Sequence, residues 1–129
     1  MLEVYTDAAT KGNPGPSAIA IVWKKDKQQE VMTEAIGTYS NHEAEFYAVE
    51  RALQLSIEYY PHEILSFRSD SKVVVDTIEK NYTGNAQFQP YLARITQLAD
   101  AVPYFFIKWI PEKQNGQADK LARQTLKDM

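Results

Sequence analysis

The sequence predicts an α/β protein with one mixed sheet and helices on its faces. Three strand-like segments come first along the chain, and helical and strand-like segments alternate after them. The first pattern is typical of antiparallel strands joined by short turns, whereas the second is typical of parallel strands joined by helices. The 129 residues fit a single domain, 1–129. A core of this size buries roughly two thirds of the surface of the unfolded chain.

The strands are predicted from alternating apolar and polar residues between turn signals. Leu2, Val4 and Thr6 alternate with their neighbours, and a turn rich in glycine and proline follows at 12–16. The predicted strands are residues 2–6, 17–24, 30–38, 63–68 and 104–110. We expect the first, fourth and fifth of these strands to be parallel neighbours.

The helices are predicted from apolar residues at helical spacing. A stretch rich in alanine and leucine follows Ser40 and Asn41, either of which can cap a helix. Near the end of the chain, Leu121 and Leu126 belong to an amphipathic pattern. The predicted helices are residues 42–59, 71–80, 87–101 and 116–127.

Composition excludes several kinds of chemistry. The chain has no cysteine, which excludes disulfides, thiolate catalysis and zinc–thiolate sites. No apolar stretch is long enough to cross a membrane, and no basic and apolar leader precedes the first strand. We therefore expect a cytoplasmic protein without a membrane partner. The net charge of −3 lacks the basic character that is usual for proteins that bind nucleic acids.

Four acidic residues, Asp7, Glu45, Asp70 and Asp119, carry the strongest functional signal. We expect Asp7 at a strand end, Asp70 between a strand and a helix, and the other two near helix starts. Open α/β sheets gather ligand-binding groups at such junctions. Carboxylates suit Mg²⁺ and Mn²⁺, and two such ions roughly 3.5–4 Å apart can clamp a phosphodiester.

Each of these acids, taken alone, also has a structural explanation. Asp7 is suited to begin a turn, and Asp70 is suited to cap the next helix. Glu45 and Asp119 are suited to the dipoles of helix N-termini. The four positions together favour the functional explanation, because acids at four such junctions point to a shared cleft.

The aromatic segment from Tyr104 to Ile110 has two interpretations. Its rings could stack on nucleic-acid bases, which requires exposed rings, or they could pack in the core. Core packing is favoured, because apolar runs of this length are usually buried strands. His42 and His62 are interpreted as exposed residues and not as catalytic bases.

Five segments, taken in order along the chain, resemble the motifs of type 1 ribonuclease H. They are Tyr5-Thr6-Asp7-Ala8-Ala9, Gly12-Asn13-Pro14-Gly15-Pro16, Asn41-His42-Glu43-Ala44-Glu45, Ser69-Asp70-Ser71 and Asn115-Gly116-Gln117-Ala118-Asp119-Lys120-Leu121-Ala122. The resemblance covers essentially the whole chain, and the motifs in this order are specific, whereas one of them alone would not be.

The resemblance implies a ribonuclease H-like fold, with a five-stranded mixed sheet, the first three strands antiparallel, and helices on both faces. It implies an enzyme that hydrolyses the RNA strand of RNA–DNA hybrids endonucleolytically, with two Mg²⁺ or Mn²⁺ ions and the substrate bound together. We expect such a protein to act as a monomer.

The resemblance also assigns roles to residues at matching positions. The metal-binding, catalytic carboxylates would be Asp7, Glu45, Asp70 and Asp119. Asn13 and Ser40 match positions that hold a phosphate of the DNA strand. Asn41 and Asn115 match positions near the scissile RNA strand.

The chain departs from the family pattern in two places. Many members carry a mobile histidine before the last aspartate, whereas residues 111–116 contain none, so its role is absent or passes to Glu112 or Lys113. Some members also carry a long basic protrusion, and here only residues 80–87 separate two helices. The departures and the acidic balance motivate one alternative, a ribonuclease H-like module that binds nucleic acid with little turnover. Another alternative is a nuclease of this fold with a different substrate.

Overall fold

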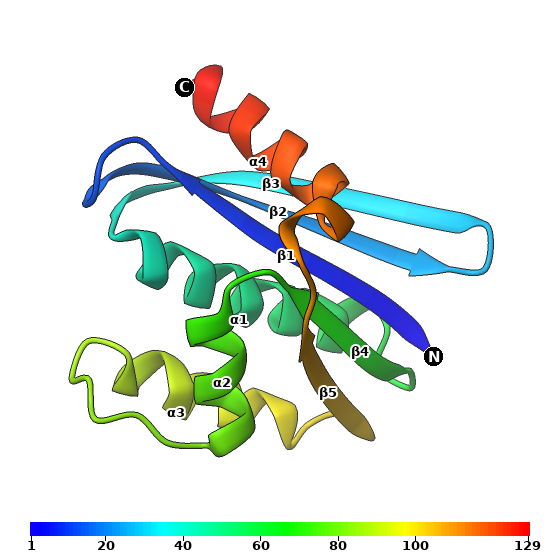
Figure 1. The fold of residues 1–129 in the computed structure, drawn as a ribbon. Helices are drawn as coiled ribbons and strands as arrows, with labels where there is room; N and C mark the ends of the chain where they lie inside the picture. Colours follow the sequence, from blue (N-terminus) through cyan, green and yellow to red (C-terminus); the bar gives the residue numbers. More distant parts are fainter.

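Five strands form a single mixed sheet in the order β3-β2-β1-β4-β5, which confirms the predicted sheet (Figure 1). The computed structural model describes all 129 residues. The strands are β1 (Leu2–Thr10), β2 (Gly15–Lys25), β3 (Gln28–Tyr39), β4 (Ile64–Ser69) and β5 (Tyr104–Trp109). The helices are α1 (Asn41–Tyr59), α2 (Lys72–Lys80), α3 (Gln89–Ala99) and α4 (Gly116–Lys127), with a short 3₁₀ helix, η1 (Glu112–Gln114), before α4.

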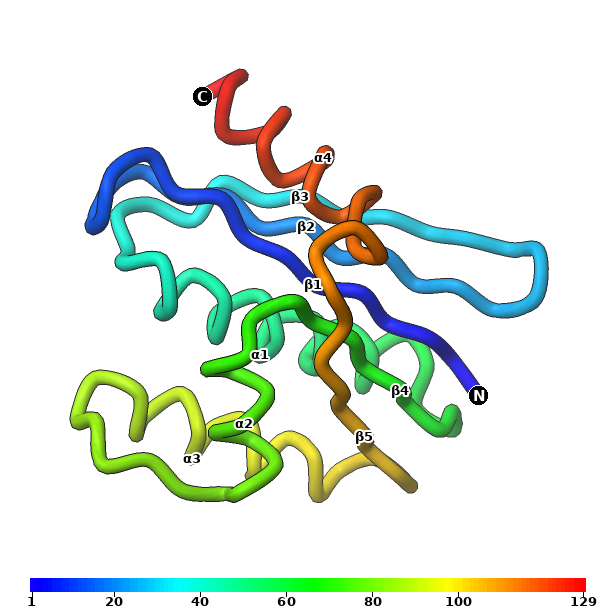
Figure 2. Tube along the Cα trace, viewed as in Figure 1, coloured from blue at the N-terminus to red at the C-terminus, as the bar shows by residue number.

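The central strand β1 combines the two kinds of pairing. It pairs antiparallel with β2 and parallel with β4, and β4 pairs parallel with β5. Figure 2 shows β1 running through the middle of the molecule between these neighbours. Thr6 pairs with Ser69, the last residue of β4. Asp7 and Asp70, which directly follow these two residues, therefore lie at the same edge of the parallel pair.

Helices cover both faces of the sheet (Figure 1). α1, α2 and α3 lie on one face, where a cluster of 16 buried residues that includes Phe46 and Phe67 forms the main core. α4 lies on the other face, where four small or medium residues form a second cluster, namely Ala20, Val22, Ala118 and Ala122. Alanine on both sides lets α4 approach the sheet closely.

Side-chain caps fix the starts of α1 and α2. The hydroxyl of Ser40 accepts a hydrogen bond from the backbone N–H of Glu43, as an N-cap does, and donates one to the Glu43 carboxylate. The hydroxyl of Ser71 accepts from the N–H of Val74 at the start of α2. The cap at Ser40 confirms the predicted start of α1, whereas α2 is capped by Ser71 and not by Asp70.

Three features differ from the sequence predictions. β1 continues to Thr10 because the residues after Asp7 still pair with β2, so Asp7 lies within a strand and not at its end. The 3₁₀ helix η1 was not predicted. Core packing is wrong for Tyr104 and Phe106, which are 61% and 54% exposed, because β5 is an edge strand and these residues point to its uncovered face. It is also wrong for Trp109, the last residue of β5, which is 49% exposed on the opposite side of the strand.

None of the helices combines the length and the apolar character that crossing a bilayer would require.

Candidate active site

Three carboxylates from distant parts of the chain converge at the point where the pairing of β1 with β4 ends. Asp7 comes from β1, Glu45 from the second turn of α1, and Asp70 from the residue after β4. One carboxylate oxygen from each residue lies within 4.8 Å of the other two. Asp7 is 4% exposed and the other two are half-buried. The structure therefore brings together three of the four predicted acids in one tight group.

Local hydrogen bonds hold Asp70 in place. The backbone N–H of Ser71 donates to the hydroxyl of Ser69 at 3.1 Å, so the chain turns sharply around Asp70. The indole Nε1 of Trp109 donates to the backbone carbonyl of Asp70 at 3.1 Å. The main chain at Asp70 is thus fixed from its own turn and from β5.

The start of α1 is tied to the turn between β1 and β2. The side-chain oxygen of Asn13 accepts a hydrogen bond from the backbone N–H of Asn41 at 2.9 Å. Both residues are exposed, and Asn41 lines the cleft that contains the carboxylates. Asn13, Ser40 and Asn41 therefore lie together at one rim of the site, although Ser40 also serves as the cap of α1.

The fourth acid, Asp119, lies in the first turn of α4, as predicted, and lines the same cleft of about 460 Å³. It stands outside the tight group of three. Its Oδ1 accepts a hydrogen bond from Nε of Arg123 at 3.1 Å, and Nη2 of Arg123 lies 3.6 Å from Oε1 of Glu112. All four predicted acids thus share one cleft, which also contains one arginine and one further acid.

The three grouped carboxyls resist ionisation. Burial, together with the negative charge of Asp70, raises the pKa of Asp7 to about 8. Burial also raises the pKa of Glu45 well above its usual range, with the charge of Asp7 as the next cause. The pKa of Asp70 is raised, first by burial, although a hydrogen bond from Asn115 opposes the shift. A cation bound beside these carboxyls would favour their ionised form.

Asn115, which was predicted to lie near the RNA strand, is buried, with 1% of its surface exposed, and its role toward the substrate stays a prediction. Its amide nitrogen donates to the backbone carbonyl of Thr6 at 2.9 Å and to Oδ2 of Asp70 at 3.4 Å. The packing of α4 against β1 draws the side chain inward, behind the carboxylates. Asn115 therefore orients Asp70 and joins the start of α4 to the sheet.

Sequence reasoning did not assign Arg123 to the site. Its spacing of four residues from Asp119 on a helix was the available signal, because residues at this spacing face the same side. Glu112, which the sequence analysis considered only as a substitute for the missing histidine, also lines the cleft. Lys113 is exposed and is not part of the cleft lining.

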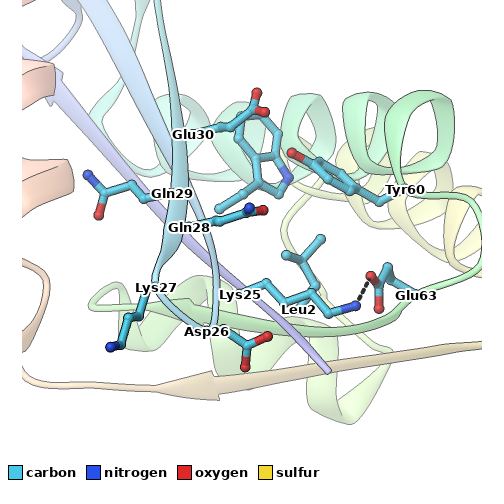
Figure 3. Close-up of a pocket in the computed structure, with 10 residues that line it drawn as sticks. Leu2, Lys25, Asp26, Lys27, Gln28, Gln29, Glu30, Tyr60 and Glu63 are labelled. Atoms are coloured by element: carbon cyan, nitrogen blue, oxygen red, sulfur yellow. Dashed lines mark hydrogen bonds and ion pairs between the residues drawn. The ribbon is translucent and has the colours of Figure 1, made fainter.

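A larger hollow of about 1090 Å³ lies at the other end of β1, between the β2–β3 turn and the end of α1 (Figure 3). Its lining mixes both signs of charge, and Lys25 and Glu63 neutralise each other there in an ion pair. Because no group of acids or other reactive side chains converges in it, the smaller cleft is the better candidate for catalysis.

The donor set of the cleft fits a hard divalent cation. The three grouped ligand atoms are all carboxylate oxygens, which Mg²⁺, Ca²⁺ and Mn²⁺ prefer over nitrogen or sulfur ligands. Their burial and mutual repulsion give the site a need for positive charge that Arg123, paired with Asp119 and Glu112, does not meet.

The fold and this group of carboxylates define a protein of the ribonuclease H-fold class. The model of the family described as "Reverse transcriptase-like" matches residues 5–125. EbsB of Enterococcus faecalis, which is named as a hydrolase, is 48% identical over 127 residues, covering 98% of this chain and 94% of that protein. Ribonuclease HI of Halobacterium salinarum is 29% identical over 134 residues, and the match spans 98% of this chain but only 65% of that relative.

Solved structures of ribonucleases H share the fold of this chain. The crystal structure of ribonuclease H1 from Halobacterium salinarum matches with a TM-score of 0.92 at 26% identity, over 99% of this chain and 98% of that one. LC11 ribonuclease H1, solved in complex with an RNA/DNA hybrid, matches with a TM-score of 0.89 at 25% identity, over 96% and 95%. The chain belongs to the reverse transcriptase-like family and, within it, to the type 1 ribonucleases H.

Proposed function

We propose that this protein is an endonuclease that hydrolyses the RNA strand of RNA–DNA hybrids through a divalent-metal site. The observation that carries the proposal is the group of Asp7, Glu45 and Asp70 within 4.8 Å, with Asp119 in the same cleft. The similar LC11 ribonuclease H1, which was solved in complex with an RNA/DNA hybrid, supports the choice of substrate.

Two Mg²⁺ or Mn²⁺ ions are proposed as the cofactors. Asp7, Glu45 and Asp70 would hold one ion, and Asp119 would contribute to the second. When bound, such ions supply positive charge that polarises the phosphoryl group and activates water. The raised pKa values of the carboxyls support this role, because metal ligands must lose their protons and a bound cation favours that loss.

The chain's own residues would position the substrate and keep the carboxylates in order. Asn115 holds Asp70 through its amide. Asn13, Ser40 and Asn41 offer short polar groups at one rim, which suit contacts with phosphates and sugar hydroxyls better than with bases. Arg123 carries positive charge into the cleft, where it is suited to contact a phosphate.

The test is an assay of three labelled substrates with each metal. We expect cleavage of an RNA–DNA hybrid within the RNA strand, with Mg²⁺ or Mn²⁺, and little cleavage of duplex RNA or duplex DNA. EDTA should stop the reaction. Cleavage of duplex DNA alone would favour a nuclease of this fold with another substrate.

The alternative of a binding module with little turnover rests on the loop before Asp119, which has no histidine. Glu112 lines the cleft from that loop and is suited to accept a proton there. Hybrid binding without cleavage under either metal would favour the binding module and would contradict our proposal.

A further inference from the structure

The uncovered part of the sheet on β4 and β5 has no role in the proposed active site. Tyr104 is 61% exposed and Phe106 is 54% exposed, although both lie in a strand of the central sheet. α4 packs on β1, β2 and β3 and lies away from β4 and β5 (Figure 1). No segment of this chain therefore covers these two rings.

The strand register shows which side chains share this surface, because directly paired residues point to the same side of a sheet. Phe106 pairs with Ser66, and Lys108 pairs with Arg68. Arg68 pairs in turn with Tyr5 of β1. We call the resulting surface the open sheet face, and it comprises Tyr104, Phe106, Lys108, Arg68, Tyr5 and Lys24.

The rings of Tyr104 and Phe106 are nearly parallel, an arrangement that suits stacking on successive bases. The planes of Tyr104 and Phe106 lie 8° apart, with their centroids separated by 6.1 Å. Exposed aromatic rings on a sheet are a known means of holding two or three bases of a single strand. Base stacking was disfavoured from the sequence only because such rings are usually buried, and the exposure of Tyr104 and Phe106 removes that objection.

The charges beside the rings favour a phosphate backbone as the partner. Lys108 and Lys24 form no ion pair in the structure. The Nη1 atom of Arg68 lies 2.7 Å from Oε1 of Glu3, and Lys24 lies 4.8 Å from the ring centre of Tyr5. Because Glu3 already pairs with Arg68, whose side chain is only 14% exposed, Lys108 and Lys24 are the cations of this surface that are left for a phosphate.

A second copy of the chain fits this surface less well. β5 is an edge strand of only six residues, and it carries a lysine within it. Short edges with lysine oppose pairing with another strand. Positive charge facing the same positive charge would also weaken an interface of two identical faces.

We propose that the open sheet face binds single-stranded nucleic acid and leads it to the carboxylate cleft. β5 ends at Trp109, whose indole donates to the backbone of Asp70. From Tyr104 to Lys108 the strand spans about 13 Å. A single-stranded extension of a hybrid would therefore lie along β5 while the paired part occupies the cleft. Binding on this face does not depend on hydrolysis.

Fluorescence anisotropy with labelled oligothymidylate and oligouridylate of twelve nucleotides tests the proposal. The measurement is made in EDTA, so that the result is independent of hydrolysis. We expect the double variant Tyr104→Ala/Phe106→Ala to bind about a hundredfold more weakly, at about tenfold for each lost stacking contact. In a plot of the logarithm of the binding constant against the logarithm of the salt concentration, Lys108→Ala should make the slope less steep by somewhat less than one unit. Comparison of the two oligonucleotides distinguishes DNA from RNA as the strand that binds.

Tyr59→Ala is the matched control, because Tyr59 is an equally exposed aromatic, at 65%, on the last turn of α1 and outside the open sheet face. It should bind both oligonucleotides like the unmodified protein. The double variant should cleave a blunt hybrid normally and lose any preference for a hybrid with a single-stranded extension. Equal affinity of the double variant and the unmodified protein would overturn the proposal. So would a dimer that the double variant abolishes, because a second copy would then occupy the face.

Discussion

Asp70 combines a proposed catalytic role with an unfavourable charge, and one substitution tests both. Asp70→Asn keeps the size of the side chain but removes a carboxylate from the group of three. We expect the rate of hybrid hydrolysis to fall by more than about a hundredfold. This loss would exceed the loss of about 10- to 100-fold that is typical of residues that only orient metal ligands. Near-normal turnover would contradict the proposed role of Asp70.

The same variant should be more stable without metal. At pH 8 the substitution removes one of the negative charges that raise the pKa of Asp7, so the remaining carboxyls repel less. We expect the melting temperature in EDTA to rise by about 2–4 °C. A fall in melting temperature would show that Asp70 stabilises the fold. The loss of activity would then be explained by loss of the folded protein.

Asn115→Ala tests whether a buried amide orients the metal-binding group. Loss of the amide removes the buried hydrogen bond to the carbonyl of Thr6, at a cost of about 1–3 kcal/mol in unfolding free energy. Activity should fall by about 10- to 100-fold, and half-maximal activity should require more Mg²⁺. Asn41→Ala is the matched control at the exposed rim and should raise KM for the hybrid without changing the Mg²⁺ requirement. If Asn115→Ala gave the pattern expected of Asn41→Ala, Asn115 would be a substrate contact.

At the scale of the elements, the start of α1 carries both a structural and a proposed binding role. Ser40→Ala removes the hydroxyl that caps α1, which should lower the unfolding free energy by about 1 kcal/mol. Thr38→Ala, at a nearby exposed residue of β3 without a side-chain hydrogen bond, is the control for stability. If Ser40 also holds a phosphate, its variant should raise KM for the hybrid. A loss of stability with unchanged KM would leave Ser40 as a cap alone.

Most elements could be predicted from sequence because their signals are local. The starts of α1 and α2 follow from Ser40 and Ser71, which bond to backbone groups three residues away. The extent of β1 could not be predicted, because its last residues are held by pairing with β2 and not by their own pattern. The exposure of Tyr104 and Phe106 depends on the strand order, which places β5 at an edge. No local pattern distinguishes an edge strand of this composition from a buried one.

At the scale of the whole molecule, the convergence of the acids follows from the topology. The junctions between parallel strands and the helices that follow them meet at one edge of a sheet. The proximity of Asp7, Asp70 and Glu45 could therefore be predicted from the sequence. The burial of Asn115 could not, because its partner Thr6 lies 109 positions away in the sequence. Long-range packing of α4 decides which polar groups face the cleft and which support it from behind.

The protonation of the cleft should make the stability of the whole protein depend on pH and on metal. An aspartate in an unfolded chain has a pKa of about 4, whereas the pKa of Asp7 in the folded protein is about 8. Between these values the folded protein binds more protons than the unfolded chain, so stability falls as pH rises. The raised pKa values of Glu45 and Asp70 act in the same direction. We therefore expect the melting temperature in EDTA to decrease from pH 5 to pH 8.

Excess Mg²⁺ should reverse this trend, because bound cations replace the protons and bind only the folded protein. Thermal melting at pH 5 and pH 8, with EDTA and with Mg²⁺, measures both effects. Asp7→Asn is the matched variant, since it removes the most strongly affected buried aspartate, and its melting temperature should change less between the two pH values. A flat profile for the unmodified protein in EDTA, with no gain from Mg²⁺ at pH 8, would contradict a cation site built from these carboxylates.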